Sequence, residues 1–310
     1  MRELIENPVN GPQCPLHKLK RAALILFSMA VLHACAAPVA QLRTFATDNR
    51  FTEIEVKAGG YSLAVFKNEM ANRSKSGVLN VYLEGDGSPW MFRTIVMRDP
   101  TPRRPLMLAL MSLDTQPAIY VGRPCYNGHF DDDGCESNLW TFGRYSVTVV
   151  DSMTSAIRAL AKRQGANDIR LYGHSGGGAL AMLLAAKLPQ VSRIVTLAGN
   201  LDTDAWTRHH RFTPLFSSLN PADQQPLAES VSQWHFVGTA DGVIPPELVR
   251  ESIMRQPQAE AYALTGFTHG CCWADIWPDI LERLESEAPV TMPGVQFKSK
   301  AQITDALGSQ

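Results

Sequence analysis

The sequence lacks several features that would mark particular classes of protein. It has no basic excess, since 29 Lys and Arg residues face 30 Asp and Glu residues, and this disfavours nucleic-acid binding. No apolar run reaches the roughly 20 residues of a membrane span, which excludes a polytopic membrane protein. Paired CxxC motifs and His-x-x-x-His spacings are also absent, which disfavours a zinc site. The 45% of hydrophobic residues supply a core and exclude a disordered chain.

The N-terminal segment has the layout of a signal peptide. An 11-residue apolar run, Ala22–Leu32, follows the basic residues Lys18, Lys20 and Arg21. The run ends in Leu-His-Ala-Cys, which resembles a bacterial lipobox. We therefore predict a signal peptide over residues 1–34, cleavage before Cys35 and a lipid on the Cys35 sulfur.

Two other interpretations of this segment stay open. Ordinary signal cleavage after Ala36 or Ala37 would give a periplasmic or secreted protein, and a buried N-terminal helix is the third interpretation. The preferred interpretation predicts an exported lipoprotein anchored to the membrane of a bacterial envelope. The rest of the chain is then one domain over residues 35–288, with a C-terminal tail over 289–310 that has no clear periodicity.

Export favours disulfide bonds, because the compartments outside the cytoplasm are oxidising. Cys125 and Cys135 enclose a short polar loop, and this is the first candidate pairing. Cys271 and Cys272 are alternative partners for that loop, and free buried thiols remain a third interpretation.

Strand-like and helix-like segments alternate through the domain. This alternation predicts an α/β fold with a mostly parallel central sheet and helices on both faces. The predicted strands are Leu79–Glu84, Ala118–Val121, Asp168–Gly173, Arg193–Ala198, Trp234–Gly238 and Ala261–Leu264, and the predicted helices are Tyr145–Gln164, Gly177–Leu188, Pro246–Arg255 and Trp273–Glu285. The pattern lapses over residues 200–230, where Trp206 and Phe212 lie in polar sequence, and this favours a short lid over the carboxyl edge of the sheet.

The sharpest motif is Gly173-His174-Ser175-Gly176-Gly177, a G-x-S-x-G sequence. It follows a predicted strand and precedes a predicted helix, which is the context of a nucleophile elbow. The tight turn would expose the Ser175 hydroxyl and direct the Gly176 N–H toward a developing oxyanion. A glycine-rich turn that binds phosphate or only packs is the alternative.

A serine nucleophile needs a base, and the base needs an acid to orient it. Asp241 and His269 each follow a later predicted strand, so both belong to the same edge as Ser175. They also keep the chain order Ser, Asp, His of this type of site. Asp202 and Asp204 are the alternatives for the acid.

Four other histidines of the domain are not expected to act in catalysis. His174 occupies the variable position of the elbow and is expected to pack beside the serine. His235 lies inside a predicted strand and is expected in the core, whereas His209 and His210 are expected in the lid.

A second oxyanion donor should come from the loop after an early central strand. The segment Leu83–Trp90 occupies that position, and its glycines allow close approach of the backbone to a substrate carbonyl. The N–H of Asp86 or Gly87 is the candidate donor.

Together these motifs resemble the α/β-hydrolase superfamily over about Leu79 to Leu284. More narrowly, LEGDGSPW, GRPC, LWTFGRYS, GHSGGG, AGNLDTDAWT, HFVGTADGVIPP and FTHGCCW are similar to a group of bacterial α/β-hydrolases with lipoprotein-type leaders. The resemblance implies a catalytic triad of Ser175, His269 and Asp241, and no particular substrate. The loop Gly85–Gly87 differs from the HGGG sequence that often supplies the second oxyanion donor.

The expected function is hydrolysis of carboxylic esters through an acyl-enzyme, without a metal or an organic cofactor. The expected partners are a small-molecule or lipid acyl substrate and, through Cys35, a membrane. A peptidase, a thioesterase or an acyltransferase would use the same triad. A non-catalytic binding lipoprotein of the envelope is the alternative from another class.

Overall fold

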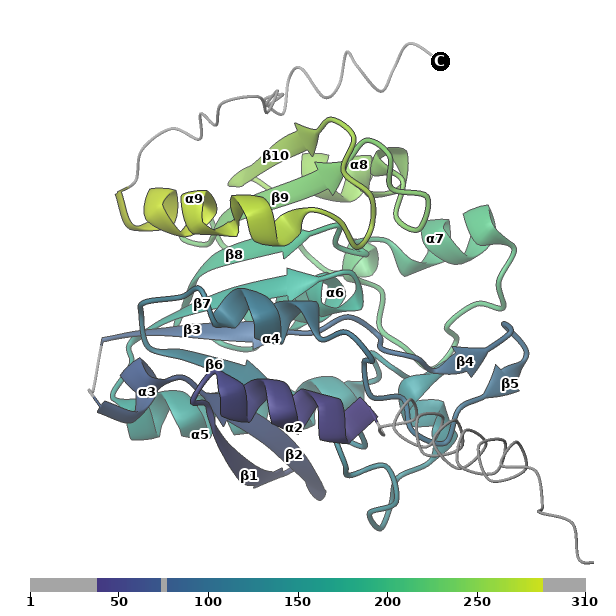
Figure 1. The fold of residues 1–310 in the computed structure, drawn as a ribbon. Coiled ribbons are helices and arrows are strands. Elements are labelled where there is room, and N and C mark those ends of the chain that lie inside the picture. The colour runs from purple at the N-terminus through teal and green to yellow at the C-terminus, as the bar shows by residue number, and fades with distance from the viewer. Residues whose placement is uncertain (1–37, 74–76, 287–310) are drawn as a thin grey trace, which may run out of the picture.

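The computed structural model describes residues 38–73 and 77–286, and they form one twisted sheet covered by helices (Figure 1). Six neighbouring strands of this sheet run parallel, and a hairpin of two further strands pairs antiparallel at one edge. The order across the sheet is β1 (Thr52–Ala58), β2 (Tyr61–Lys67), β6 (Ala118–Val121), β3 (Val78–Leu83), β7 (Asp168–His174), β8 (Val191–Leu197), β9 (Ser232–Gly238) and β10 (Ala259–Leu264).

Helices cover both faces of this sheet (Figure 1). One face packs against α2 (Pro38–Asp48), α4 (Leu106–Met111) and α9 (Trp273–Ser286). The other face packs against α3 (Glu69–Arg73), α5 (Val147–Gln164), α6 (Gly176–Ala185) and α8 (Pro246–Met254). The predicted mostly parallel sheet with helices on both faces is confirmed.

The sequence of each central element follows from its burial. All four residues of β6 are buried, which suits a strand covered on both faces and explains its unbroken apolar run. Every residue of α6 is buried as well, so this helix has no polar face. The amphipathic α5 is bounded by recognisable caps: the Ser146 hydroxyl accepts a hydrogen bond from the Val149 N–H, and Gly165 ends the helix at a φ of 73°.

Several elements were not predicted from the sequence. The structure adds α2, β1, β2 and α3 before Val78, the short helix α4, and a separate two-stranded sheet of β4 (Trp90–Met91) and β5 (Ile95–Val96). The segment 200–230 also contains a helix, α7 (Thr203–His210). Short or largely polar elements carry little periodic hydrophobicity, so their pattern in the sequence is weak.

The predicted signal peptide, the lipidation site Cys35 and the tail 289–310 lie outside the described residues. Across ranges 38–73 and 77–286, no helix combines the length and the apolar composition needed to cross a membrane.

Candidate active site

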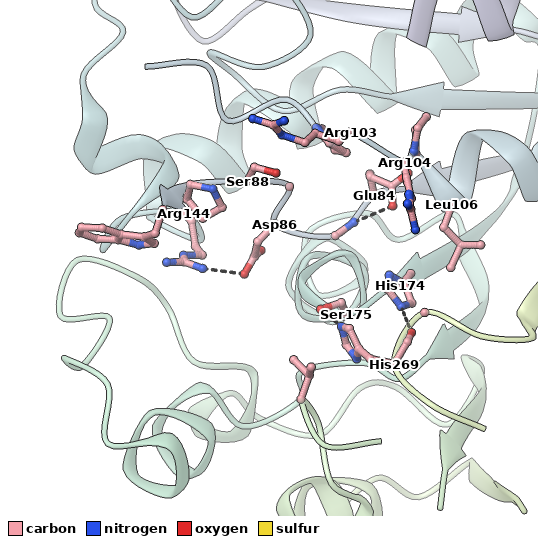
Figure 2. A pocket seen from close by; sticks show the side chains of 18 of the residues that line it. Glu84, Asp86, Ser88, Arg103, Arg104, Leu106, Arg144, His174, Ser175 and His269 are labelled. Atoms are coloured by element: carbon pink, nitrogen blue, oxygen red, sulfur yellow. Dashed lines mark hydrogen bonds and ion pairs between the residues drawn. The ribbon is translucent and has the colours of Figure 1, made fainter. Parts of the chain in front are cut away.

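Three side chains from separate segments meet at the carboxyl edge of the sheet, and Figure 2 shows two of them, Ser175 and His269. Ser175 lies between β7 and α6, Asp241 follows β9, and His269 follows β10. The Nε2 atom of His269 lies 3.0 Å from the Ser175 Oγ, and its Nδ1 lies 2.9 Å from the Asp241 Oδ2. The structure therefore brings together the three residues that the sequence selects, hydrogen-bonded in the order Ser, His, Asp.

The turn at Ser175 has the geometry of a nucleophile elbow. Ser175 has a φ of 54°, in the left-handed region that L-residues rarely adopt. The turn is also tightly packed, because a Cβ on Gly177 would lie 2.0 Å from the carbonyl oxygen of Leu83 on β3. In this strained and tightly packed turn, the serine hydroxyl projects from the backbone toward His269.

Asp241 is fixed on both of its carboxylate oxygens. Its Oδ1 accepts hydrogen bonds from the N–H groups of Val243 and Ile244 at 2.8 and 2.9 Å, which leaves Oδ2 for His269. Burial alone would raise the pKa of this carboxyl, but the hydrogen bond and charge of His269 and the two backbone donors hold the pKa below its ordinary value. An ionised Asp241 requires a proton on Nδ1 of His269, so Nε2 is the atom free to accept the serine proton.

The His269 backbone is held in place by two further donors. His174 Nε2 and Trp273 Nε1 both donate to its carbonyl oxygen, at 2.8 and 3.0 Å. Burial, with the neighbouring His269, lowers the pKa of His174 to about 4, so this imidazole is neutral near pH 7. His174 therefore packs beside the serine as expected, and its structural contact is to the loop that carries His269.

The remaining sequence candidates lie elsewhere. His235 is buried, and its Nδ1 lies 2.8 Å from the Thr196 hydroxyl. Asp202 caps α7 by accepting hydrogen bonds from two backbone N–H groups at its start, and Asp204 is exposed in the first turn of that helix. His210 donates a hydrogen bond from Nε2 to the Val243 carbonyl, because a carbonyl oxygen can only accept.

Two backbone segments border the space above Ser175. Gly176 is the first residue of α6, where the N–H groups of a helix have no intrahelical acceptor. In the loop after β3, the Gly85 N–H donates to Glu84 Oε1 and the Ser88 N–H donates to the Pro100 carbonyl. The amides of Asp86 and Gly87, which lie between these two, are the candidate donors of this loop.

The carboxylate of Asp86 has a role that the sequence analysis missed. It is bound by Arg123 Nη1 at 2.9 Å, by Arg144 Nη1 at 2.8 Å and by the Tyr145 hydroxyl at 2.6 Å. We call these four residues the Asp86 clamp. Burial would raise the pKa of Asp86, but Arg144 and Arg123, with the hydrogen bond from Tyr145, lower it to about 2.

The Asp86 clamp joins the two segments that border the serine. Arg123 Nη2 also donates to the Glu84 carbonyl, and the Tyr126 hydroxyl donates to the Asp86 carbonyl, so the backbone on both sides of the Asp86 amide is held. A Cβ on Gly176 would lie 1.9 Å from Asp86 Oδ1, which shows how closely the carboxylate approaches the elbow. The clamp thus fixes the loop after β3 against the start of α6.

The cysteines pair within the described chain. Cys125 and Cys135, the first candidate pair, form a disulfide that closes the loop after Arg123, and Tyr126 lies within this loop. Cys271 and Cys272 are joined to each other and do not reach that loop. Their pairing corrects the alternative in which they would bond to Cys125 or Cys135.

A cavity of about 1170 Å³ opens over Ser175 and His269 (Figure 2). Aromatic and aliphatic side chains form much of its wall, and arginines lie on the side of the loop after β3. Among the lining residues are Phe45, Trp90, Leu106, Phe142, Trp206, Phe212, Leu215, Val243, Arg93, Arg103 and Arg104. In the part of the chain that the structure describes, no cluster of three or more His, Cys, Asp or Glu side chains could hold a metal ion.

Comparison with known proteins gives similarity at the level of structure. No family model matches the chain, and no curated protein sequence matches it. The esterase Pf2001 of Pyrococcus furiosus superposes with a TM-score of 0.55 at 13% identity, over 77% of this chain and 91% of its own. XC6422 of Xanthomonas campestris, described as an α/β serine hydrolase without a lid, gives 0.53 at 11% identity, over 78% and 97%. Est1E of Butyrivibrio proteoclasticus gives 0.51 at 11% identity, over 76% and 98%.

The chain has the α/β-hydrolase fold. Within this α/β-hydrolase fold, the segment between β8 and β9 that was predicted as a lid supplies Trp206, Phe212 and Leu215 to the cavity wall. The residues missed from the sequence are the arginines and the tyrosine of the Asp86 clamp. They lie in the motifs GRPC and GRYS, and nothing in these motifs indicates that the side chains meet Asp86.

Proposed function

We propose that the protein is a serine hydrolase that cleaves carboxylic esters through an acyl-enzyme. The observation that carries the proposal is the unbroken chain of hydrogen bonds from Ser175 Oγ through His269 to Asp241, at the floor of a large cavity. A serine hydroxyl 3.0 Å from an imidazole nitrogen is placed for transfer of its proton, and the carboxylate behind the imidazole stabilises the charge that this transfer creates.

The reaction proceeds in two halves. His269 Nε2 takes the Ser175 proton as Oγ forms a bond to the acyl carbon, and it then returns the proton to the departing alkoxide as the ester C–O bond breaks. A water molecule next gives its proton to His269 and attacks the acyl-enzyme carbon, and the proton on His269 returns to Ser175 as the acid leaves. Asp241 keeps the same imidazole tautomer through both halves.

The tetrahedral oxyanion is stabilised by the N–H of Gly176 together with the N–H of Asp86 or Gly87. These donors belong to segments that are held before substrate arrives, so little reorganisation accompanies the reaction. The side chains of the Asp86 clamp position this loop. Both of its arginines are paired with the Asp86 carboxylate, and they therefore hold the loop in place.

The wall of the cavity suits a substrate with an apolar group beside the reacting carbonyl. The aromatic and aliphatic residues of the wall, Phe142, Trp206 and Leu215 among them, favour an apolar acyl or alkoxy group beside the serine. The same triad serves peptidases, thioesterases and acyltransferases, so the leaving group has to be measured.

A fluorophosphonate probe and a series of p-nitrophenyl acyl esters test the proposal. The wild-type protein is expected to be labelled and to hydrolyse the esters, with a preferred acyl length that reports the size of the cavity. Ser175→Ala is expected to lose labelling, and its turnover should fall by about 10⁴-fold or more because the nucleophile is gone.

The control is Ser217→Ala, a serine after Leu215 that does not line the cavity. It should be labelled and active like the wild type. A folded wild-type protein that is neither labelled nor active would overturn the proposal and favour a binding function. Labelling without ester turnover would keep the nucleophile and replace esters by thioesters, peptides or acyl transfer.

A further inference from the structure

Exposed apolar side chains gather around the mouth of the cavity. Ten large hydrophobic side chains are exposed in the part of the chain that the structure describes, and six of them lie on segments that line the cavity. These six are Met91, Phe92, Ile95, Val96, Phe216 and Val243, and we call them the mouth patch. Isolated exposed apolar residues are ordinary on a protein surface, but a group concentrated at one opening indicates a surface that binds something.

Most of the mouth patch belongs to the small hairpin of β4 and β5. Trp90 and Arg93 of this hairpin line the cavity, while Met91, Phe92, Ile95 and Val96 face solvent. In Figure 1 the hairpin lies at the same end of the molecule as α7. The two are in contact, since Arg93 Nη2 donates to the His210 carbonyl at 3.4 Å and its guanidinium lies 4.6 Å from the Phe212 ring centre.

The tip of this hairpin exposes an aromatic ring at a conformational cost. Phe92 is 81% exposed and has a φ of 51°, and Arg93 follows with a φ of 65°. Glycine and asparagine adopt this left-handed region readily, whereas a bulky residue there is uncommon. An exposed phenylalanine at such a turn gains nothing for the fold, and it is consistent with a side chain presented to a partner.

The other side of the mouth is tied to the hairpin by stacked rings. Trp90 packs edge-on against Phe142 at 5.7 Å, and Phe142 stacks on Phe216 at 4.8 Å. Phe216 is itself 71% exposed. The exposed apolar surface therefore continues from β4–β5 across Phe142 to the segment between β8 and β9.

The exposed charged side chains that line the cavity beside this patch are all arginines. Arg93, Arg103 and Arg104 line the cavity and are exposed, and none of the ion pairs in the described ranges involves them. The carboxylates of the same wall are occupied: Asp86 is paired with two arginines, and Glu84 accepts hydrogen bonds from the N–H groups of Gly85 and Met107. Apolar side chains bordered by unpaired guanidinium groups suit an anionic lipid surface.

We infer that the mouth patch docks on an anionic lipid surface, so that the cavity receives its acyl ester from the lipid phase. The docking stands on the patch alone, and the choice of a lipid ester rests on the proposed hydrolase function. The predicted lipid on Cys35 agrees with this orientation. Two residues separate Cys35 from Pro38, so that the chain between them reaches at most about 11 Å. The start of α2 lies at the end of the molecule that carries β4 and β5 (Figure 1).

Binding to vesicles tests the docking without any catalysis. The protein is prepared with Ser175→Ala, so that it consumes no substrate, and with Cys35→Ser, so that it carries no lipid. It is then sedimented with vesicles of phosphatidylcholine and with vesicles in which part of that lipid is replaced by phosphatidylglycerol. We expect binding that is stronger with phosphatidylglycerol and that weakens by about fivefold for each of Arg103→Gln and Arg104→Gln.

The double variant Phe92→Asn/Ile95→Thr removes apolar surface while suiting the local backbone. Asparagine adopts a positive φ readily, and threonine keeps the β-branch of a strand residue. In the Ser175→Ala protein, this double variant should bind vesicles about tenfold or more weakly. With Ser175 restored, it should hydrolyse a soluble short ester like the wild type, because neither residue lines the cavity. Its activity on an ester embedded in vesicles should fall in step with binding.

The matched control is Leu113→Asn/Val147→Thr, which alters two exposed apolar residues outside the patch. It should bind vesicles like the parent protein. Equal binding by the two double variants, or no vesicle binding at all, would overturn the inference. Self-association that is abolished by Phe92→Asn/Ile95→Thr, in a protein that ignores vesicles, would also overturn it and assign the patch to a second copy of the chain. Vesicle binding by a protein without esterase activity would keep the docking and overturn the proposed function alone.

Discussion

The Asp86 clamp and the mouth patch lie on the same cavity and are built in opposite ways. In the clamp, the side chains of Arg123 and Arg144 are only 4% and 6% exposed, and each is paired with the same carboxylate. In the mouth patch, Phe92 is 81% exposed, and the neighbouring Arg103 and Arg104 have no carboxylate partner in the described ranges. The charged groups of the clamp are buried and paired with one another, whereas the apolar groups of the mouth patch are exposed.

The difference separates two tasks of the site. Groups that stabilise an oxyanion must be in place before the substrate arrives, because a misplaced donor loses most of its effect. Groups that meet a substrate or a lipid surface must instead stay accessible. Substitutions near the triad and in the clamp should therefore change kcat, whereas substitutions at the mouth should change KM or binding.

The largest expected effect is on the triad itself. Asp241→Asn keeps an oxygen that can accept the Val243 and Ile244 N–H groups, but it presents an amide to His269 Nδ1 and so favours the wrong imidazole tautomer. We expect kcat to fall by about 10³–10⁴-fold, with KM and the thermal unfolding midpoint nearly unchanged. Steady-state kinetics on a soluble ester and thermal unfolding measure both, and retention of wild-type kcat would remove Asp241 from the mechanism.

A smaller effect on rate and a large one on stability are expected in the clamp. Asp86→Ala leaves two buried guanidinium groups without their carboxylate, which should lower the free energy of unfolding by about 3–5 kcal/mol. In the protein that remains folded, the loop after β3 is no longer fixed, and kcat should fall by about 10²-fold while KM changes little. Asp86→Asn keeps the shape of the side chain and some of its hydrogen bonds. Its stability and its kcat should therefore lie between those of the wild type and those of Asp86→Ala. A change in KM alone would place Asp86 in substrate binding.

The same carboxylate makes stability depend on pH. The pKa of Asp86 in the folded protein is about 2, below the ordinary value of 3.8, so its ionised form is favoured by folding. This contribution is fully present above about pH 4 and is lost as the pH falls through 2, because the unfolded chain then binds the proton first. Unfolding by denaturant at several pH values between about 2 and 6 should show a steeper acid loss in the wild type than in Asp86→Asn.

The fold and the hydrogen-bonded set of Ser175, His269 and Asp241 were predicted from the sequence for the same reason. The strands β7, β9 and β10 are rich in apolar residues, and each of the three side chains lies within five residues of the end of one of them, so strand pattern and position locate them together. The elements before Val78 and the helix α4 were not predicted, because β1 has a single buried residue, Val56, and α4 is only six residues long.

The clamp and the mouth patch could not be located in this way. Asp86 bonds to Arg123, which is 37 residues away in the chain, and to Arg144, which is 58 residues away. Nothing in the local pattern indicates that these side chains meet. Phe92 and Ile95 read as ordinary apolar residues, since their exposure depends on a hairpin that packs on no larger sheet. Tertiary pairing of buried charges and exposure of apolar residues are both properties of the assembled chain.

The smallest expected effect tests the mouth side of the comparison. Trp206 lines the cavity, donates from Nε1 to the Val243 carbonyl at 3.0 Å and packs against Phe212. Trp206→Leu removes ring surface that would contact an acyl chain, so KM for long-chain esters should rise by up to about tenfold while kcat for a short ester is kept. Trp206→Phe, which loses the donor and keeps a ring, should move KM less. A loss of kcat with unchanged KM in Trp206→Leu would mean that the segment between β8 and β9 sets the catalytic geometry, and the division between a fixed interior and an accessible mouth would no longer hold.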